Sequence, residues 1–191
     1  MTKLFLLPLL ALLLFSSCYS LKKSVESGKP YNEQINWPQG YDMDETEFYL
    51  HNKIEIEAPP EIVWEILTYA EDWPNWYKGM KNVSVVNSQD GIIDGKVDLS
   101  FNTMKRDFNA KVTEYQPYER LSWETIHPKM MGVHAWLIIP TDKGCLVVTD
   151  ESQHGKLARL QKLFLPNKLR KLHDVWLEEM KIKAEAKVKA N

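Results

Sequence analysis

The chain has 191 residues, of which 44% are hydrophobic and 26% are charged, and its formal net charge is -2. This balance excludes a disordered polyelectrolyte and a protein with several membrane spans, and it argues against a protein that coats nucleic acid. Two cysteines are too few for a disulfide scaffold, and 10 prolines and 8 glycines show no collagen-like or low-complexity pattern. We therefore expect one ordinary domain.

The first segment is typical of a targeting signal. Residues 4–15 form an apolar run that only Pro8 interrupts, too short to cross a bilayer of roughly 30 Å at about 1.5 Å per helical residue. The run leads into Leu-Phe-Ser-Ser-Cys at residues 14–18, which resembles a bacterial lipobox. We expect residues 1–17 to be a signal peptide and Cys18 to carry a lipid that anchors the protein in a bacterial cell envelope. A plain signal of a secreted or periplasmic protein is the alternative.

Residues 18–48 are predicted to be a spacer between the anchor and the domain. They are rich in Ser, Lys, Gly, Pro and Asn and show no apolar period. Tyr31, Ile35, Trp37 and Tyr41 are too apolar for a purely solvated linker. We therefore expect part of the spacer to lie on the domain surface.

The domain, residues 49–191, is expected to begin with a strand and two short helices. Ile54 and Ile56 alternate with charged residues, which is the period of a half-buried strand. Two prolines then end the strand, and apolar residues at helical spacing predict a helix over residues 61–68. A second helical stretch follows, with Asp72 as a candidate cap.

A period of two then predicts six further strands. Turn residues such as Asp-Gly and Gln-Pro pairs separate them, and the last two strands cover residues 132–140 and 144–152. The residues that mark one face of the other strands are Val83, Val85, Val97, Leu99, Phe101, Phe108, Ala110, Val112, Leu121 and Trp123. Consecutive strands with short turns predict a curved antiparallel meander whose apolar face must be covered.

The C-terminal segment is the expected cover. Leu169, Leu172, Trp176 and Met180 recur at spacings of three and four on one helical face. Residues 156–190 hold ten Lys or Arg and four Asp or Glu. This basic face is either simply solvated or attracted to anionic lipid head groups.

The chain resembles the START-like superfamily, also called SRPBCC or Bet v 1-like, and within it the polyketide cyclase/dehydrase branch. The residues that carry the resemblance are IEAPPEIVW at 56–64, WPNW at 73–76, FNAKVTE at 108–114, ERLSW at 119–123, HAW at 134–136 before Pro140, and Gly144 followed by Glu151 and Gly155. The resemblance implies an α+β helix-grip fold: a curved antiparallel sheet of about seven strands wrapped around a long C-terminal helix, with two short helices after the first strand. It also implies an apolar cavity for a hydrophobic small molecule.

Successive side chains of a strand point to opposite faces of the sheet, and the resemblance implies which face points inward. Together they predict which side chains line that cavity. The expected ligand-binding residues are Trp76, Tyr77, Phe101, Trp123, Thr125, Trp136, Thr149 and Trp176. The opposite face of the last hairpin is also apolar, with Leu137, Ile139, Leu146 and Val148. We expect the spacer, a second subunit or the membrane to cover it, unless these are ordinary exposed aliphatic residues.

Few residues suggest chemistry. The chain has no phosphate loop, no His-Glu-x-x-His, no Cys-x-x-Cys and no Gly-x-Ser-x-Gly, so we expect no cofactor and no metal. His134 and Glu151 are the candidate acid and base, because a desolvated carboxyl group next to an imidazole can exchange a proton with it. The alternative is a purely structural pair. The remaining histidines, expected at the surface or in loops, are His51, His127, His154 and His173.

Three functions remain open. The preferred one is a lipid-anchored envelope protein that binds or carries a hydrophobic small molecule without transforming it. The second is a cyclase- or dehydratase-type enzyme acting on an aromatic or polyketide-like substrate. The third is an interaction module that docks on a protein or a membrane, with a homodimer as one option. We expect no nucleic-acid partner.

Overall fold

The computed structural model describes residues 22–86, 88 and 90–190. The predicted signal peptide and Cys18 lie outside them. The strands are β1 (Phe48–Ile56), β2 (Met80–Val86), β3 (Asp98–Thr103), β4 (Arg106–Gln116), β5 (Arg120–His127), β6 (Met130–Thr141) and β7 (Gly144–His154). The helices are α2 (Pro60–Thr68), α3 (Trp73–Trp76), α4 (Lys156–Phe164) and α5 (Pro166–Ala190), with a 3-10 turn over Ala70–Asp72.

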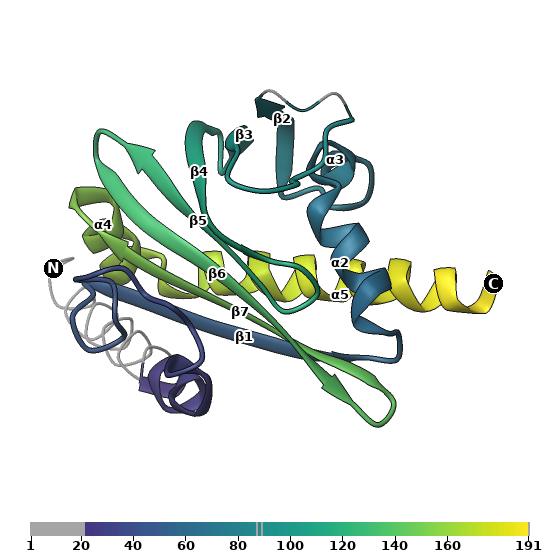
Figure 1. The fold of residues 1–191 in the computed structure, drawn as a ribbon. Helices are drawn as coiled ribbons and strands as arrows, with labels where there is room; N and C mark the ends of the chain where they lie inside the picture. The colour runs from purple at the N-terminus through teal and green to yellow at the C-terminus, as the bar shows by residue number, and fades with distance from the viewer. Residues whose placement is uncertain (1–21, 87, 89, 191) are drawn as a thin grey trace, which may run out of the picture.

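The strands form one antiparallel sheet in the order β1-β7-β6-β5-β4-β3-β2. Each strand from β2 to β7 pairs with its neighbour in the chain, and β1 joins the edge beside β7. Figure 1 shows the sheet curving across the long helix α5. The predicted α+β helix-grip arrangement, with about seven strands and two short helices after the first strand, is confirmed.

The starts of the two short helices involve proline and Asp72. Proline occupies the start of both α2 and α3, where its missing N–H removes no helical hydrogen bond. Asp72 occupies the N-cap position of α3, as predicted, but its side chain makes no capping hydrogen bond. Its carboxylate instead accepts hydrogen bonds from Asn75 Nδ2 and Lys183 Nζ, both at 2.8 Å. Asp72 thus ties α3 to the C-terminal half of α5.

One face of α5 covers the sheet, as its apolar spacing predicted. Trp176 and Met180 from the predicted stripe are buried, together with Leu169, while Leu172 is half-buried. His173 lies on the same face and is 2% exposed. Among the described residues, no helix combines the length and apolar character that crossing a bilayer requires.

Large aromatic side chains fill the space between the middle of α5 and the sheet. Trp73, Trp123, Trp136 and Trp176 are all fully buried. The Trp176 ring lies 5.1 Å from the Trp73 ring, 5.0 Å from Trp136 and 6.4 Å from Trp123, measured between centroids. Interlocked aromatic rings are worth more than their buried area alone. The centre of the fold is thus solid, and the cavity expected there is absent from this part of the structure.

The predicted spacer is folded onto the outer face of the sheet. Residues 22–32 are helical, and Ile35 makes a small buried cluster with Ala135, Leu137 and Val148. Tyr31, Trp37, Ile139 and Leu146 border that cluster. Of the three covers expected for the outer hairpin face, the spacer is the one that the structure shows.

Candidate functional site

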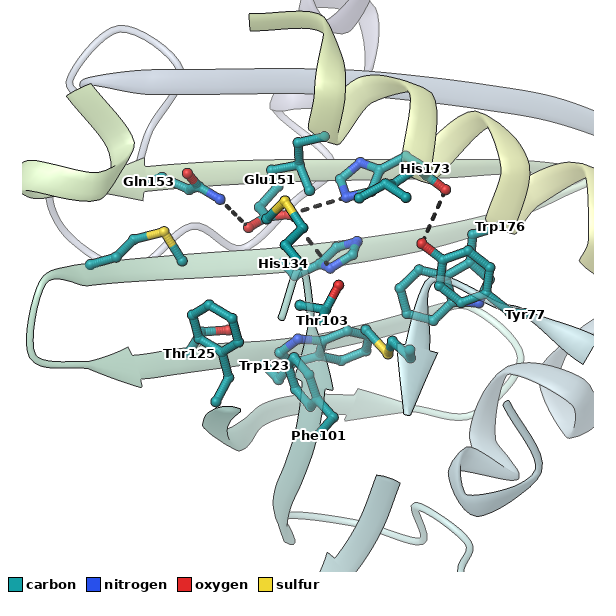
Figure 2. Close-up of a pocket in the computed structure, with 16 residues that line it drawn as sticks. Tyr77, Phe101, Thr103, Trp123, Thr125, His134, Glu151, Gln153, His173 and Trp176 are labelled. Carbon is teal, nitrogen blue, oxygen red and sulfur yellow. Dashed lines mark hydrogen bonds and ion pairs between the residues drawn. The ribbon is translucent and has the colours of Figure 1, made fainter. Parts of the chain in front are cut away.

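A small pocket lies between the N-terminal half of α5 and the sheet, beside the aromatic centre (Figure 2). Its volume is about 40 Å³, space for about three water molecules at roughly 10–15 Å³ each. Most of its wall is aromatic or aliphatic, and flexible side chains contribute much of it: Met80, Met104, Met130, Leu169 and Leu172. The pocket is an apolar niche rather than a spacious tunnel.

Three ionisable side chains converge on one wall of this pocket. His134 of β6 and Glu151 of β7 are direct partners across the sheet, so strand alternation places both side chains on the inner face. His173 comes from α5 and meets them from the opposite side, as Figure 2 shows. Glu151 Oε2 lies 3.1 Å from His173 Nε2 and 3.9 Å from His134 Nδ1. The two imidazole rings are stacked, with centroids 4.8 Å apart.

Neighbouring side chains hold this cluster in position. His134 Nε2 makes a 2.6 Å hydrogen bond with Thr149 Oγ1, which fixes the ring and turns Nδ1 toward Glu151. Gln153 Nε2 donates to Glu151 Oε1 at 2.5 Å. The Trp136 ring also stacks on the His134 ring, at 5.1 Å between centroids. The orientation of the cluster is thus set before any ligand arrives.

The environment gives His134 and Glu151 the same chemical character. Burial, assisted by the nearby His173, lowers the pKa of His134 to about 3. Burial acts to raise the pKa of Glu151, but the hydrogen bond from His173 and the nearby His134 outweigh it, so this pKa lies below its usual range. At neutral pH His134 is therefore uncharged and Glu151 is ionised. Both groups are therefore in forms that can accept a hydrogen bond, and their assignment as acid and base stays a prediction.

Five of the predicted ligand-binding residues line the pocket: Tyr77, Phe101, Thr125, Trp123 and Trp176. His134 and Glu151 line it too. The Tyr77 hydroxyl is already engaged, because it donates to the carbonyl oxygen of Leu172 at 3.2 Å. Burial raises the pKa of Tyr77, so the hydroxyl stays protonated.

The other three predicted ligand-binding residues lie off the pocket wall. Trp76 is half-buried and packs at the edge of the core, and Trp136 belongs to the aromatic centre. Thr149 lies behind His134 as its hydrogen-bond partner. The alternation of side chains along a strand correctly predicted that Trp136 and Thr149 face inward. It could not show whether an inward side chain lines the pocket or belongs to the solid core.

Sequence reasoning missed His173, the third member of the cluster. It was expected at the surface, as was His51, and both are buried. The signal was present: His173 lies four residues after Leu169 and three before Trp176, so it shares their helical face. His127 and His154 are partly exposed near strand ends.

The cluster also has the composition of a metal site. One ligand atom from each of His134, Glu151 and His173 lies within 4.8 Å of the others. Ligands about 2.0–2.1 Å from a zinc ion lie at most about 4 Å apart. Metal binding would therefore require the three side chains to draw together and the His173–Glu151 hydrogen bond to break. As it stands, the arrangement serves hydrogen bonding and proton acceptance.

Similar solved structures share this fold. A hypothetical protein from Helicobacter pylori superimposes with a TM-score of 0.74 at 24% identity, over 78% of this chain and 95% of that one. The Zhui aromatase/cyclase from Streptomyces sp. R1128 gives 0.62 at 12% identity, over 73% and 94%. A START superfamily protein from Mycobacterium smegmatis gives 0.58 at 15% identity, over 72% and 97%. At these low sequence identities the superpositions show that the folds are alike, and nothing about a shared function.

A search of curated proteins finds no match to this chain. Among protein families, the one described as polyketide cyclase / dehydrase and lipid transport matches residues 48–185. This range contains the whole sheet and every residue of the pocket. The chain therefore belongs to the polyketide cyclase / dehydrase and lipid transport family.

Proposed function

We propose that the protein binds a hydrophobic small molecule that carries one hydrogen-bonding group. The observation behind this proposal is the convergence of His134, Glu151 and His173 on one wall of an otherwise apolar pocket. An apolar niche with a few convergent polar groups is the usual form of a small-molecule site. The ionised Glu151 favours a ligand group that can donate a hydrogen bond, such as a hydroxyl.

The pocket must enlarge to accept such a ligand. A volume of about 40 Å³ holds only a few heavy atoms. Met80, Met104 and Met130 lie in the wall, and methionine side chains adopt many shapes at little energetic expense. Leu172 is half-buried at the same place. We propose that these side chains move aside together and that the aromatic centre stays in place.

Two measurements test the binding proposal. Native mass spectrometry of protein purified from its own host should show a co-purifying apolar molecule. In parallel, N-phenyl-1-naphthylamine, an apolar amine whose fluorescence rises on burial, should bind to the purified protein. Glu151→Gln should weaken that binding roughly 10- to 100-fold, because a hydrogen bond to a charged group is worth about 1.5–3 kcal/mol.

The matched control is Glu55→Gln, which removes one carboxylate from an exposed position of β1. A second variant, Leu172→Trp, should block the pocket mouth without touching the charged cluster. If Glu55→Gln weakens probe binding as much as Glu151→Gln, or if Leu172→Trp leaves it unchanged, the probe binds elsewhere and the proposal is wrong.

A second candidate function is proton abstraction from the bound molecule, as in an aldol-type ring closure. The specific observation in its favour is geometric: an imidazole, His134, and a carboxylate, Glu151, lie side by side on the pocket wall, and these are the side chains that most often transfer protons in enzymes. The co-purifying molecule, once identified, provides the test. Catalysis predicts that the protein transforms it and that His134→Gln abolishes the reaction while the molecule still binds. Return of the molecule unchanged by the wild-type protein would favour binding alone.

We also propose that Cys18 carries a lipid and anchors the protein in a bacterial envelope. The support is the Leu-Phe-Ser-Ser-Cys sequence after an apolar run. Metabolic labelling with a palmitate analogue tests it in the host. Wild-type protein should incorporate the label and fractionate with membranes, and Cys18→Ser should do neither. Labelling that survives in Cys18→Ser would refute the assignment.

A further inference from the structure

The structure exposes a run of large apolar side chains at the junction of α4 and α5. Leu160 is 51% exposed, Leu163 51%, Phe164 68% and Leu165 49%. In α4, Ala158 is buried and Leu157 is half-buried against the core, whereas Leu160, Leu163 and Phe164 face outward. Single exposed aliphatic residues are common, but a contiguous exposed patch marks an interaction surface.

The patch belongs to a firmly held helix rather than a frayed end. Glu47, just before β1, accepts a hydrogen bond from the backbone N–H of Gly155 at 2.8 Å and one from Arg159 Nε at 3.1 Å. Lys162 Nζ donates to the Glu47 carbonyl oxygen at 2.8 Å. Figure 1 shows α4 at the end of the sheet, beside the start of β1. The apolar residues are therefore presented to solvent in a fixed arrangement.

The charged side chains of the segment that carries the patch have one sign, and Glu47 pairs with one of them, Arg159. Residues 156–173 contain six Lys or Arg and no Asp or Glu, whereas residues 174–190 contain four of each sign. The positive excess of the C-terminal segment is thus confined to the part that exposes the apolar patch. Long basic side chains can lay their stems on apolar surface and keep their charge in the head-group region.

The basic surface continues at the mouth of the pocket. A groove of about 260 Å³ next to the pocket is lined by Lys78, Lys81, Lys105 and Lys168. Thr103, Met104 and Leu172 line both the groove and the pocket. The basic groove therefore adjoins the pocket, and Lys168 in its wall follows the exposed patch by three residues in the chain.

We propose that residues 156–171 dock on an anionic lipid bilayer. Phe164 and the neighbouring leucines enter the acyl boundary, and the lysines contact the head groups, as in other interfacial amphipathic helices. This inference goes beyond the proposed ligand binding and does not depend on it. Its consequence for that function is that the pocket mouth, which includes Leu169 and Leu172, opens at the membrane.

An environment-sensitive label at the patch tests the docking. The protein is the full chain with Cys18→Ser and Leu163→Cys, labelled with a nitrobenzoxadiazole dye. Cys145 is buried, and burial raises the pKa of its thiol to about 11, so we expect the dye to label position 163. The control carries the dye at Ile182→Cys, a 62% exposed position in the charge-balanced half of α5. Phosphatidylcholine vesicles with phosphatidylglycerol should shift the emission of the label at position 163 to shorter wavelength and leave the label at position 182 unchanged. Pure phosphatidylcholine should shift neither.

Removing positive charges from residues 156–171 is a second test of the docking. Lys156→Gln, Lys168→Gln and Lys171→Gln together should weaken partitioning to the anionic vesicles by roughly 100-fold, at about fivefold for each basic residue near the surface. Lys96→Gln, Lys111→Gln and Lys143→Gln remove the same charge from other exposed positions and should have little effect.

Three outcomes would overturn the docking proposal. The first is an unchanged emission wavelength of the label at position 163 while the protein is bound to vesicles. The second is an equal shift of both labels. The third is a shift at position 163 that appears without vesicles as the protein concentration rises, which would assign the patch to a second copy of the chain. No hydrophobic ligand is added in the vesicle experiments. Their outcome therefore neither supports nor contradicts the proposed binding of a small molecule in the pocket.

Discussion

Two neighbouring residues of β7 build buried carboxylate clusters on opposite faces of the sheet. Asp150 points outward, where Tyr49 Oη donates to Oδ2 at 2.6 Å and His51 Nδ1 lies 2.6 Å from Oδ1. Glu151 points inward to His134 and His173. The two clusters contain similar groups, and the difference between them is access.

The outer cluster is closed off by the folded spacer. Asp150 is fully buried, and the Tyr31 ring stacks over His51 at 5.4 Å. Burial and the adjacent Asp150 raise the pKa of Tyr49, so its hydroxyl stays protonated as a donor. The inner cluster instead lines a pocket, and His134 Nδ1 lies 3.9 Å from Glu151, beyond a direct hydrogen bond. A buried acid–histidine group therefore suggests ligand chemistry only where a cavity reaches it.

The largest expected effect comes from removing each carboxylate in turn. Asp150→Ala leaves Tyr49 and His51 buried without their partner and should lower the free energy of unfolding by about 3–5 kcal/mol. Glu151→Ala should lower it by about 1–3 kcal/mol, because water can enter the pocket and solvate His173 and Gln153. Urea unfolding at pH 7 measures both. Equal losses, or the reverse order, would contradict the division into a sealed and an accessible cluster.

The pH dependence of stability isolates the inner cluster. The pKa of His134 is about 3 in the folded chain, against 6.5 for a free imidazole. Between these values the unfolded chain binds one more proton, so the free energy of unfolding falls as pH drops from 6.5 toward 3, by up to about 1.4 kcal/mol per pH unit. The stability contributed by Glu151 is present above its unfolded pKa of about 4.3 and is lost only at lower pH.

The window from pH 6.5 to 5 lies above the range in which Glu151 titrates, and it covers the range in which His134 lowers stability. His134→Gln should remove about 2 kcal/mol of the pH-dependent loss across it. His127→Gln, at the end of β5, is the control and should keep the wild-type slope. An unchanged slope in His134→Gln would mean that this imidazole is not held neutral by burial.

Gly28→Ala tests the seal over the outer cluster. Gly28 lies in the helix of residues 22–32, and a Cβ there would overlap Tyr49 Oη. Because Asp150 holds that hydroxyl, the helix must shift, and we expect a loss of about 1–3 kcal/mol in stability. Intrinsic helix propensity alone predicts the opposite sign, a gain of about 1 kcal/mol.

Urea unfolding combined with proteolysis of the N-terminal segment measures the effect of Gly28→Ala. Glu26→Ala, exposed on the same helix, is the matched control and should change little. A more stable Gly28→Ala variant would show that the helix does not press on Tyr49.

The smallest expected effect is that of Tyr77→Phe. The loss of its hydrogen bond to the Leu172 carbonyl should lower stability by about 0.5–1.5 kcal/mol, while the ring keeps its stacking on Trp176 at 4.8 Å. Affinity for the naphthylamine probe should stay the same, because the hydroxyl is engaged within the protein. A variant with wild-type stability and weakened probe binding would instead make this hydroxyl a ligand contact.

Sequence patterns were sufficient to predict the fold because the spacing of apolar residues follows from the backbone geometry of each strand or helix. The period of two in the strands and the spacing of three and four in α5 each follow from backbone geometry. The same parity placed His134 and Glu151 on one face, since they oppose each other across a single hairpin. For His173 in α5 the sequence interpretation was wrong. Its spacing places it on the apolar face of the helix, but it was assigned to the surface or a loop because it is polar.

Tertiary structure alone decided how much room the interior leaves and which clusters a ligand can reach. Free volume depends on how Trp73, Trp123, Trp136 and Trp176 interlock, and these side chains come from separate elements whose distances no local pattern encodes. The same holds for the cover over Asp150, because Tyr31 in the covering segment lies 119 residues before Asp150 in the chain. Sequence alone therefore determined the strands of the sheet, the long helix α5 and which side chains share one face of a strand. Contact between distant elements determined the solid centre, the small polar-walled pocket and the sealed outer cluster.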